Sequence, residues 1–125
     1  MINIALVATG GAIGSVFRYL VGVWSMRLAG PNFPWGTLAV NIVGSFLIGL
    51  LVELVARRLN ASMEMRLFLV TGVLGGFTTF SSFSLDAVSL FERGAIGLSA
   101  FYILASLLVS LAAVFAGLAL GRNLF

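Results

Sequence analysis

The sequence predicts an all-α integral membrane protein built from four transmembrane helices. Of its 125 residues, 61% are hydrophobic and 9% are charged, whereas about a quarter of the residues in an ordinary soluble domain are charged. So few charged side chains cannot cover the surface of a water-soluble domain of this length. The sequence contains no cysteine and no histidine, which excludes disulfides, thiolate ligands and the commonest general base. The net charge of +3 comes from dispersed arginines, which argues against a nucleic-acid partner.

Four apolar runs are long enough to cross a bilayer, because a spanning helix needs about 20 mostly apolar residues. The predicted spans are residues 3–28, 35–55, 65–91 and 96–121. The first ends at a turn that holds both prolines, Pro31 and Pro34, since proline lacks the N–H that continues a helix. The connections between spans are short. We therefore expect a single four-helix membrane domain over residues 1–125.

The arginines near the span ends give little preference for one orientation in the membrane. Arg57, Arg58, Arg66 and Arg122 fall on the side of the two termini, and Arg27 and Arg93 fall on the other. Under the positive-inside rule this is a weak bias. A four-helix unit has little interior to spare for a solute pathway, so we expect an oligomer. If both orientations are made, the simplest closed assembly is an antiparallel two-fold dimer.

Small and polar residues recur at helical spacing on three of the spans. These stripes are Gly10, Gly14, Arg18 and Gly22 on the first, Thr37, Asn41, Ser45 and Gly49 on the second, and Ser99, Tyr102, Ser106 and Ser110 on the fourth. For the small residues the favoured interpretation is close helix packing. For Asn41, helix contact and ligand contact are equally open. Arg18 is either an interfacial anchor or a fixed positive charge that attracts anions.

The third span predicts a helix break between Gly75 and Thr79. Adjacent glycines precede a run of hydroxyl residues that compete for backbone hydrogen bonds. Backbone groups freed at membrane depth are tolerated only inside protein or beside a watery cavity. Freed carbonyls can bind a cation, and the amino end of the following half-helix favours an anion. The break therefore predicts an ion site whose preferred charge is open.

Two phenylalanines follow the predicted break on one helix face. Phe80 and Phe83 are three residues apart, and Thr79, Ser82 and Asp86 lie along a neighbouring polar face. Aromatic residues in a membrane helix ordinarily face lipid or pack in a core. The alternative is that the positive ring edges contact an anion in a pore.

Three motifs, read together, resemble the Fluc fluoride channels, also called the CrcB family. They are GSVFRY at residues 14–19, GTLAVNIVGSFLIG at 36–49 and GGFTTFSSF at 75–83. The resemblance covers essentially the whole chain. One departure is Ser82, where threonine is expected to be common in the family, and both residues carry a hydroxyl.

The resemblance implies a bacterial, fluoride-selective passive channel and not an enzyme. It implies an antiparallel, dual-topology homodimer in the cytoplasmic (inner) membrane, with two pores along the subunit interface that export fluoride. The implied pore residues are Asn41, Phe80, Phe83, Tyr102, Ser106, Ser110, Thr79 and Ser82, with Arg18 in a vestibule. The backbone carbonyls of Gly75 and Thr78 are implied to hold a structural sodium ion at the interface, and no organic cofactor is expected.

Two other functions are compatible with four short spans. A proton-coupled multidrug exporter of dual topology needs a carboxylate within the membrane. The first span has none, and Glu53 and Asp86 lie towards span ends. A non-transporting scaffold subunit would account for the glycine stripes but not for the break and the aligned hydroxyls.

Overall fold

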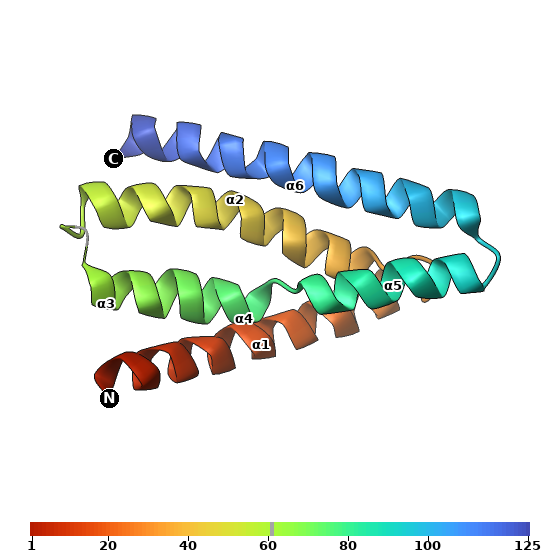
Figure 1. The fold of residues 1–125 in the computed structure, drawn as a ribbon, viewed down its shortest axis with the longest axis horizontal. Helices are drawn as coiled ribbons and strands as arrows, with labels where there is room; N and C mark the ends of the chain where they lie inside the picture. The colour runs from red at the N-terminus through yellow and green to blue at the C-terminus, as the bar shows by residue number, and fades with distance from the viewer. Residues whose placement is uncertain (61) are drawn as a thin grey trace.

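The structure, a computed structural model, describes residues 1–60 and 62–125 and is built from helices in antiparallel succession (Figure 1). Three helices are continuous: α1 (Ile2–Ala29), α2 (Trp35–Arg57) and α6 (Ile96–Leu124). The third span is divided into α3 (Met63–Arg66), η1 (Leu67–Leu74), α4 (Gly75–Phe77) and α5 (Phe80–Glu92). Within the described residues, four helical stretches are long and apolar enough to cross a membrane. The length and composition of these helices confirm the prediction of an all-helical membrane protein.

Glycines with positive φ end the helices at two turns. Gly30, at φ 79°, follows α1 and donates its N–H to the carbonyl of Met26. Gly94, at φ 85°, lies between α5 and α6. Only glycine adopts this backbone region without steric cost. Both turns are short, so consecutive helices run in opposite directions, and Figure 1 shows the two termini at the same end of the molecule.

Close backbone contacts join the helices in two pairs. α2 packs along α6, and α1 packs along η1. Gly117 on α6 faces the carbonyl of Phe46 on α2, and Gly10 on α1 faces Gly72. A side chain at any of these glycines would overlap a neighbouring backbone. The packing interpretation of the glycine stripes is therefore confirmed at Gly10, whereas a Cβ on Gly22 would meet nothing within 4 Å.

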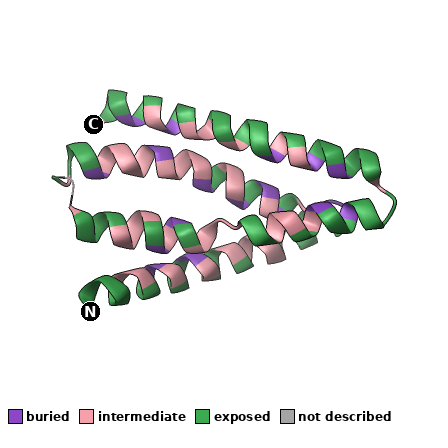
Figure 2. Ribbon diagram, in the orientation of Figure 1, coloured by how far each residue is buried: buried purple, intermediate pink, exposed green. Residues whose placement is uncertain are grey.

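Many large apolar side chains are exposed on the helices, and Figure 2 shows exposed residues along each of the long helices. The small buried core gathers near the end of the molecule that holds the α1–α2 turn, around Phe33, Leu90 and Tyr102. An exposed apolar surface of this extent suits contact with lipid or with another protein. The exterior of the fold is thus apolar, as the composition predicts.

The break in the third span is shorter than predicted. The predicted break ran from Gly75 to Thr79, but residues 75–77 stay helical as α4. The backbone becomes extended only at Thr78 (φ −84°, ψ 159°) and Thr79 (φ −155°, ψ 125°). Gly76 serves close packing instead, since a Cβ on it would lie 2.5 Å from the carbonyl oxygen of Gly11. The eight-residue π-helical segment η1 was not predicted.

Candidate functional site

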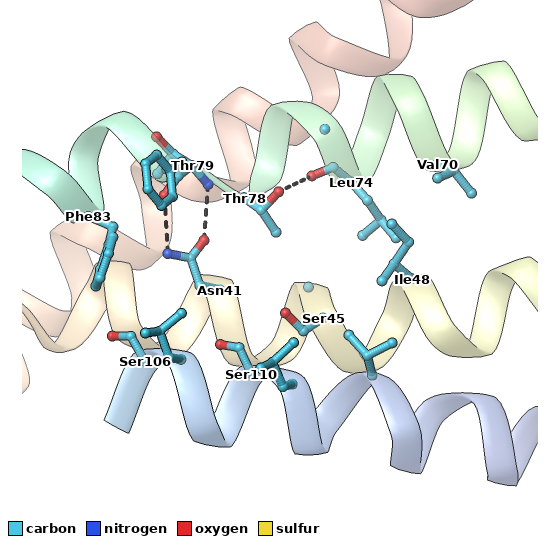
Figure 3. Close-up of a pocket in the computed structure, with 16 residues that line it drawn as sticks. Asn41, Ser45, Ile48, Val70, Leu74, Thr78, Thr79, Phe83, Ser106 and Ser110 are labelled. Atoms are coloured by element: carbon cyan, nitrogen blue, oxygen red, sulfur yellow. Dashed lines mark hydrogen bonds between the residues drawn. The ribbon is translucent and has the colours of Figure 1, made fainter. Parts of the chain in front are cut away.

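A pocket of about 360 Å³ lies beside the helix break, between α2, the third span and α6 (Figure 3). Most of the predicted site residues line it. They are Asn41, Gly75, Thr78, Thr79, Phe80, Phe83, Ser106 and Ser110. The remaining wall is largely apolar, with Ile48 and Val70 among its residues. The pocket therefore places a few polar groups in an apolar setting, as ligand sites commonly do.

The side chain of Asn41 both donates a hydrogen bond to the backbone of the break and accepts one from it. Its Nδ2 donates to the carbonyl of Thr79 at 3.1 Å, and its Oδ1 accepts from the N–H of Thr79 at 3.0 Å. The carboxamide thereby supplies both partners that Thr79 loses when the helix stops. The helix-contact interpretation of Asn41 is confirmed. Because Nδ2 carries two protons, this contact leaves one N–H for a ligand in the pocket.

The hydrogen bonds around the break leave the backbone carbonyls of Gly75 and Thr78 without their helical partners. In a continuous helix the N–H of Thr79 would donate to Gly75, and the N–H of Ser82 would donate to Thr78. Here the first donates to Asn41, and the second donates to Thr79 Oγ1 at 3.2 Å as a helix cap. The carbonyl oxygens of Gly75 and Thr78 are the two that the sequence resemblance assigns to sodium. Both are freed from helical pairing.

Two buried hydroxyls on α6 face the pocket. Ser106 Oγ and Ser110 Oγ are inaccessible to solvent and have no hydrogen-bond partner among the residues that the structure describes. In Figure 3 both serines lie on the far side of Asn41 from the break. Ser45, one turn after Asn41 on α2, also lines the pocket. Its place in the polar stripe of α2 was the signal for Ser45, although it was not among the predicted site residues.

The aromatic residues form a chain that runs from the pocket into the core. The ring centroids of Phe80 and Phe83 are 5.6 Å apart, and those of Phe83 and Tyr102 are 5.3 Å apart. Phe80 is 77% exposed, whereas Tyr102 is fully buried. The hydroxyl of Tyr102 donates to Asp86 Oδ2 at 3.3 Å. Tyr102 is therefore behind Phe83 and does not line the pocket.

Arg18 and Ser82 lie at a second pocket, of about 480 Å³, which Thr79 also lines. The half-buried Arg18 donates its Nε–H to the carbonyl of Gly76 at 3.1 Å. The guanidinium of Arg18 therefore contacts a carbonyl of α4, and both interpretations of Arg18, as an interfacial anchor and as a fixed charge for anions, stay predictions.

The two carboxylates of the exporter hypothesis are both engaged by other side chains. Glu53 accepts hydrogen bonds from Arg57 at 2.8 Å and from Arg122 at 3.1 Å. Asp86 accepts the hydroxyl of Tyr102. Neither residue lines the pocket beside the break. The pocket beside the break therefore lacks the carboxylate that proton exchange for a cationic drug would need.

Four apolar helices, and a largely apolar pocket that holds a few polar groups at a broken span, define a small multi-pass membrane protein with a potential ion site. The family model described as "CrcB-like protein, Camphor Resistance (CrcB)" matches residues 5–118. The chain belongs to this family.

Curated relatives match the chain over nearly its whole length. It is 97% identical over 125 residues, all of both chains, to the "Fluoride-specific ion channel FluC" of Agrobacterium fabrum strain C58. Proteins of the same name from Rhizobium etli CFN 42 and Mesorhizobium japonicum are 66% and 54% identical, each over 99% of both chains.

Proposed function

We propose that this chain is a fluoride-selective passive ion channel that lets cytoplasmic fluoride leave a bacterial cell through the inner membrane. Relatives that are 97%, 66% and 54% identical carry the name of a fluoride-specific ion channel. A passive channel needs no nucleotide and no covalent chemistry, so the protein is not an enzyme. Residues 1–125 act as one membrane domain in this proposal.

The observation that carries the proposal is the pair of buried hydroxyls, Ser106 Oγ and Ser110 Oγ. Each lacks a partner among the described residues, and a buried, unpaired polar group costs about 1–3 kcal/mol. A small anion that accepts a hydrogen bond from each would offset this cost. Fluoride suits the site because it is compact and a strong hydrogen-bond acceptor. The second Nδ2 proton of Asn41 supplies another donor.

The phenyl rings contribute a weaker contact to the same path. Phe80 and Phe83 line the pocket, and the edge of a phenyl ring carries partial positive charge. A ring edge attracts an anion without binding it tightly. Conduction requires such sites, because an ion held too strongly would not leave. We propose that these two rings, with the hydroxyls of Thr79 and Ser82, pass fluoride between the two pockets. Tyr102 packs behind Phe83 and would support its ring from the core.

The open side of the pocket supports a dimer. Leu107 and Leu111 line the pocket and are 50% and 57% exposed, so a conduction path along it would be open to lipid in a single subunit. A second, inverted copy of the chain would close this wall. The two-fold symmetry of such a dimer gives two pores, one for each copy of the site.

A sodium ion fits the carbonyls that the break releases. The oxygens of Gly75 and Thr78 are neutral, hard donors, and backbone carbonyls are common ligands of alkali cations in membrane proteins. In an antiparallel dimer each subunit would contribute both oxygens. When bound, the ion would link the two breaks and add a fixed positive charge near the pores.

Fluoride efflux from liposomes tests the proposed function. Purified protein is reconstituted into liposomes loaded with potassium fluoride, valinomycin is added, and external fluoride is followed with an electrode. We expect rapid efflux, and a parallel preparation loaded with potassium chloride should release chloride far more slowly. Efflux no faster than from protein-free liposomes would refute the proposal.

A further inference from the structure

We infer that Arg18 is a positioning residue that replaces a backbone hydrogen bond lost at the helix break. This role differs from that of a vestibule charge, because it depends on the location of one N–H group and not on the positive charge. Its consequences for conduction rest on the proposed function. Its consequences for the structure of the break do not.

The lost bond can be identified from the backbone. In a continuous helix the N–H of Phe80 would donate to the carbonyl of Gly76. The extended residues Thr78 and Thr79 move Phe80 out of reach and end this pairing. The Nε–H of Arg18, from α1, donates to the Gly76 carbonyl at 3.1 Å instead. A side chain thus supplies the donor that the third span has lost.

The position of Arg18 follows from the contact between α1 and the third span. A Cβ on Gly76 would lie 2.5 Å from Gly11 O, and Gly10 on α1 lies against Gly72. These glycines bring the two backbones together. Arg18 is one turn beyond Gly14 on the same stripe, which places its guanidinium beside the last helical turn before the break.

Arg18 and Asn41 hold the break from two different helices. Asn41, on α2, binds Thr79, and Arg18, on α1, binds Gly76. The carbonyls of Gly75 and Thr78, which this pairing leaves free, lie next to the two that are held. We therefore expect the Arg18 contact to fix the geometry of the ion site from the side opposite the pocket.

Two substitutions of Arg18 separate the hydrogen bond from the charge. Arg18→Gln places an amide Nε2 the same number of bonds from the backbone as the arginine Nε, and it removes the charge. Arg18→Met has the same length but neither donor nor charge. A vestibule charge predicts that both neutral variants lose function equally. The positioning role predicts that glutamine preserves what methionine loses.

The experiment measures both conduction and the backbone of the break. Fluoride efflux is recorded for the wild type and for both variants, together with amide hydrogen exchange over residues 75–82 in lipid nanodiscs. We expect efflux of Arg18→Gln within about threefold of the wild type and a loss of more than about tenfold for Arg18→Met. Exchange at Thr78 and Thr79 should accelerate in the methionine variant alone.

Each outcome decides the inference. If Arg18→Gln falls as far as Arg18→Met, with exchange unchanged in both, the positioning role is refuted and the charge explains the loss. If Arg18→Met fails to assemble and Arg18→Gln assembles, the role is supported, because lipid alone would favour methionine over glutamine. If the wild type itself does not conduct fluoride, the proposed function fails, and hydrogen exchange still decides the role of Arg18.

Discussion

Asn41 and Thr79 form a reciprocal pair in which one carboxamide satisfies both backbone groups of one residue. Nδ2 of Asn41 donates to the Thr79 carbonyl, and Oδ1 accepts the Thr79 N–H. Only a carboxamide side chain offers a donor and an acceptor in this arrangement. Since Asn41 also lines the pocket, the residue that stabilises the break is also available to an ion beside it.

Asn41→Asp is expected to reduce fluoride efflux by more than about tenfold at neutral pH. A carboxylate still accepts the N–H of Thr79, but it cannot donate to the carbonyl, and it adds negative charge to an anion pathway. Efflux from liposomes measures the change. The control is Asn60→Asp, at an exposed turn outside the pocket, which should conduct like the wild type. Normal conduction by Asn41→Asp would exclude its role in the pore.

Phe80→Ile and Phe83→Ile are each expected to lower efflux while the protein still folds. Isoleucine fills part of the space but lacks the positive ring edge that attracts an anion. Phe115→Ile is the matched control, because Phe115 is exposed on α6 and does not line the pocket. Efflux and thermal unfolding are measured for all three variants. Unchanged throughput in a folded Phe80 or Phe83 variant would show that ring edges do not guide the ion.

Sequence patterns predicted the four spans, because each apolar run is long enough to cross a bilayer and ends at charges or at a proline turn. They also located the helix break and most of the pocket, since glycine and hydroxyl residues weaken a helix locally. The exact bounds of the break depended on tertiary contacts. Residues 75–77 stay helical where α1 packs against Gly76, and spacing along one chain does not reveal such a neighbour.

Two contacts of site residues could not be predicted from the sequence either. The pairing of Asn41 with Thr79 joins residues that are 38 positions apart, and the stripe on α2 gave no indication of its partner. Tyr102 lies on the same stripe as Ser106 and Ser110, yet only the serines line the pocket. Its ring is covered by Phe33 from the α1–α2 turn, at a centroid distance of 5.5 Å. Helical periodicity identifies a face but not what covers it.

Ser106→Ala and Ser110→Ala are expected to lower fluoride efflux without lowering stability. Removing a buried hydroxyl that has no partner among the described residues should leave the free energy of unfolding unchanged or raise it by about 1 kcal/mol. Ser99→Ala is the matched control on α6, because Ser99 is buried and donates to the Ala87 carbonyl at 2.8 Å.

The control should show the opposite behaviour. Ser99→Ala should lower the unfolding free energy by about 1 kcal/mol, since the hydrogen bond is lost, and should leave fluoride efflux unchanged. Both quantities are measured on the same preparations, by thermal unfolding and by the fluoride electrode. If the Ser106 and Ser110 variants lose stability and keep their efflux, their hydroxyls are structural groups and not ion ligands.

Gly10→Ala is expected to destabilise the protein, and Gly11→Ala is not. A Cβ on Gly10 would lie 2.6 Å from the carbonyl oxygen of Phe68 and 2.9 Å from Gly72 Cα, whereas a Cβ on Gly11 would meet nothing within 4 Å. Forcing α1 away from η1 should cost roughly 1–3 kcal/mol. At Gly11, alanine's higher helix propensity should stabilise by up to about 1 kcal/mol. The two variants have identical composition, so equal unfolding temperatures in the same lipid would contradict the close contact between α1 and η1.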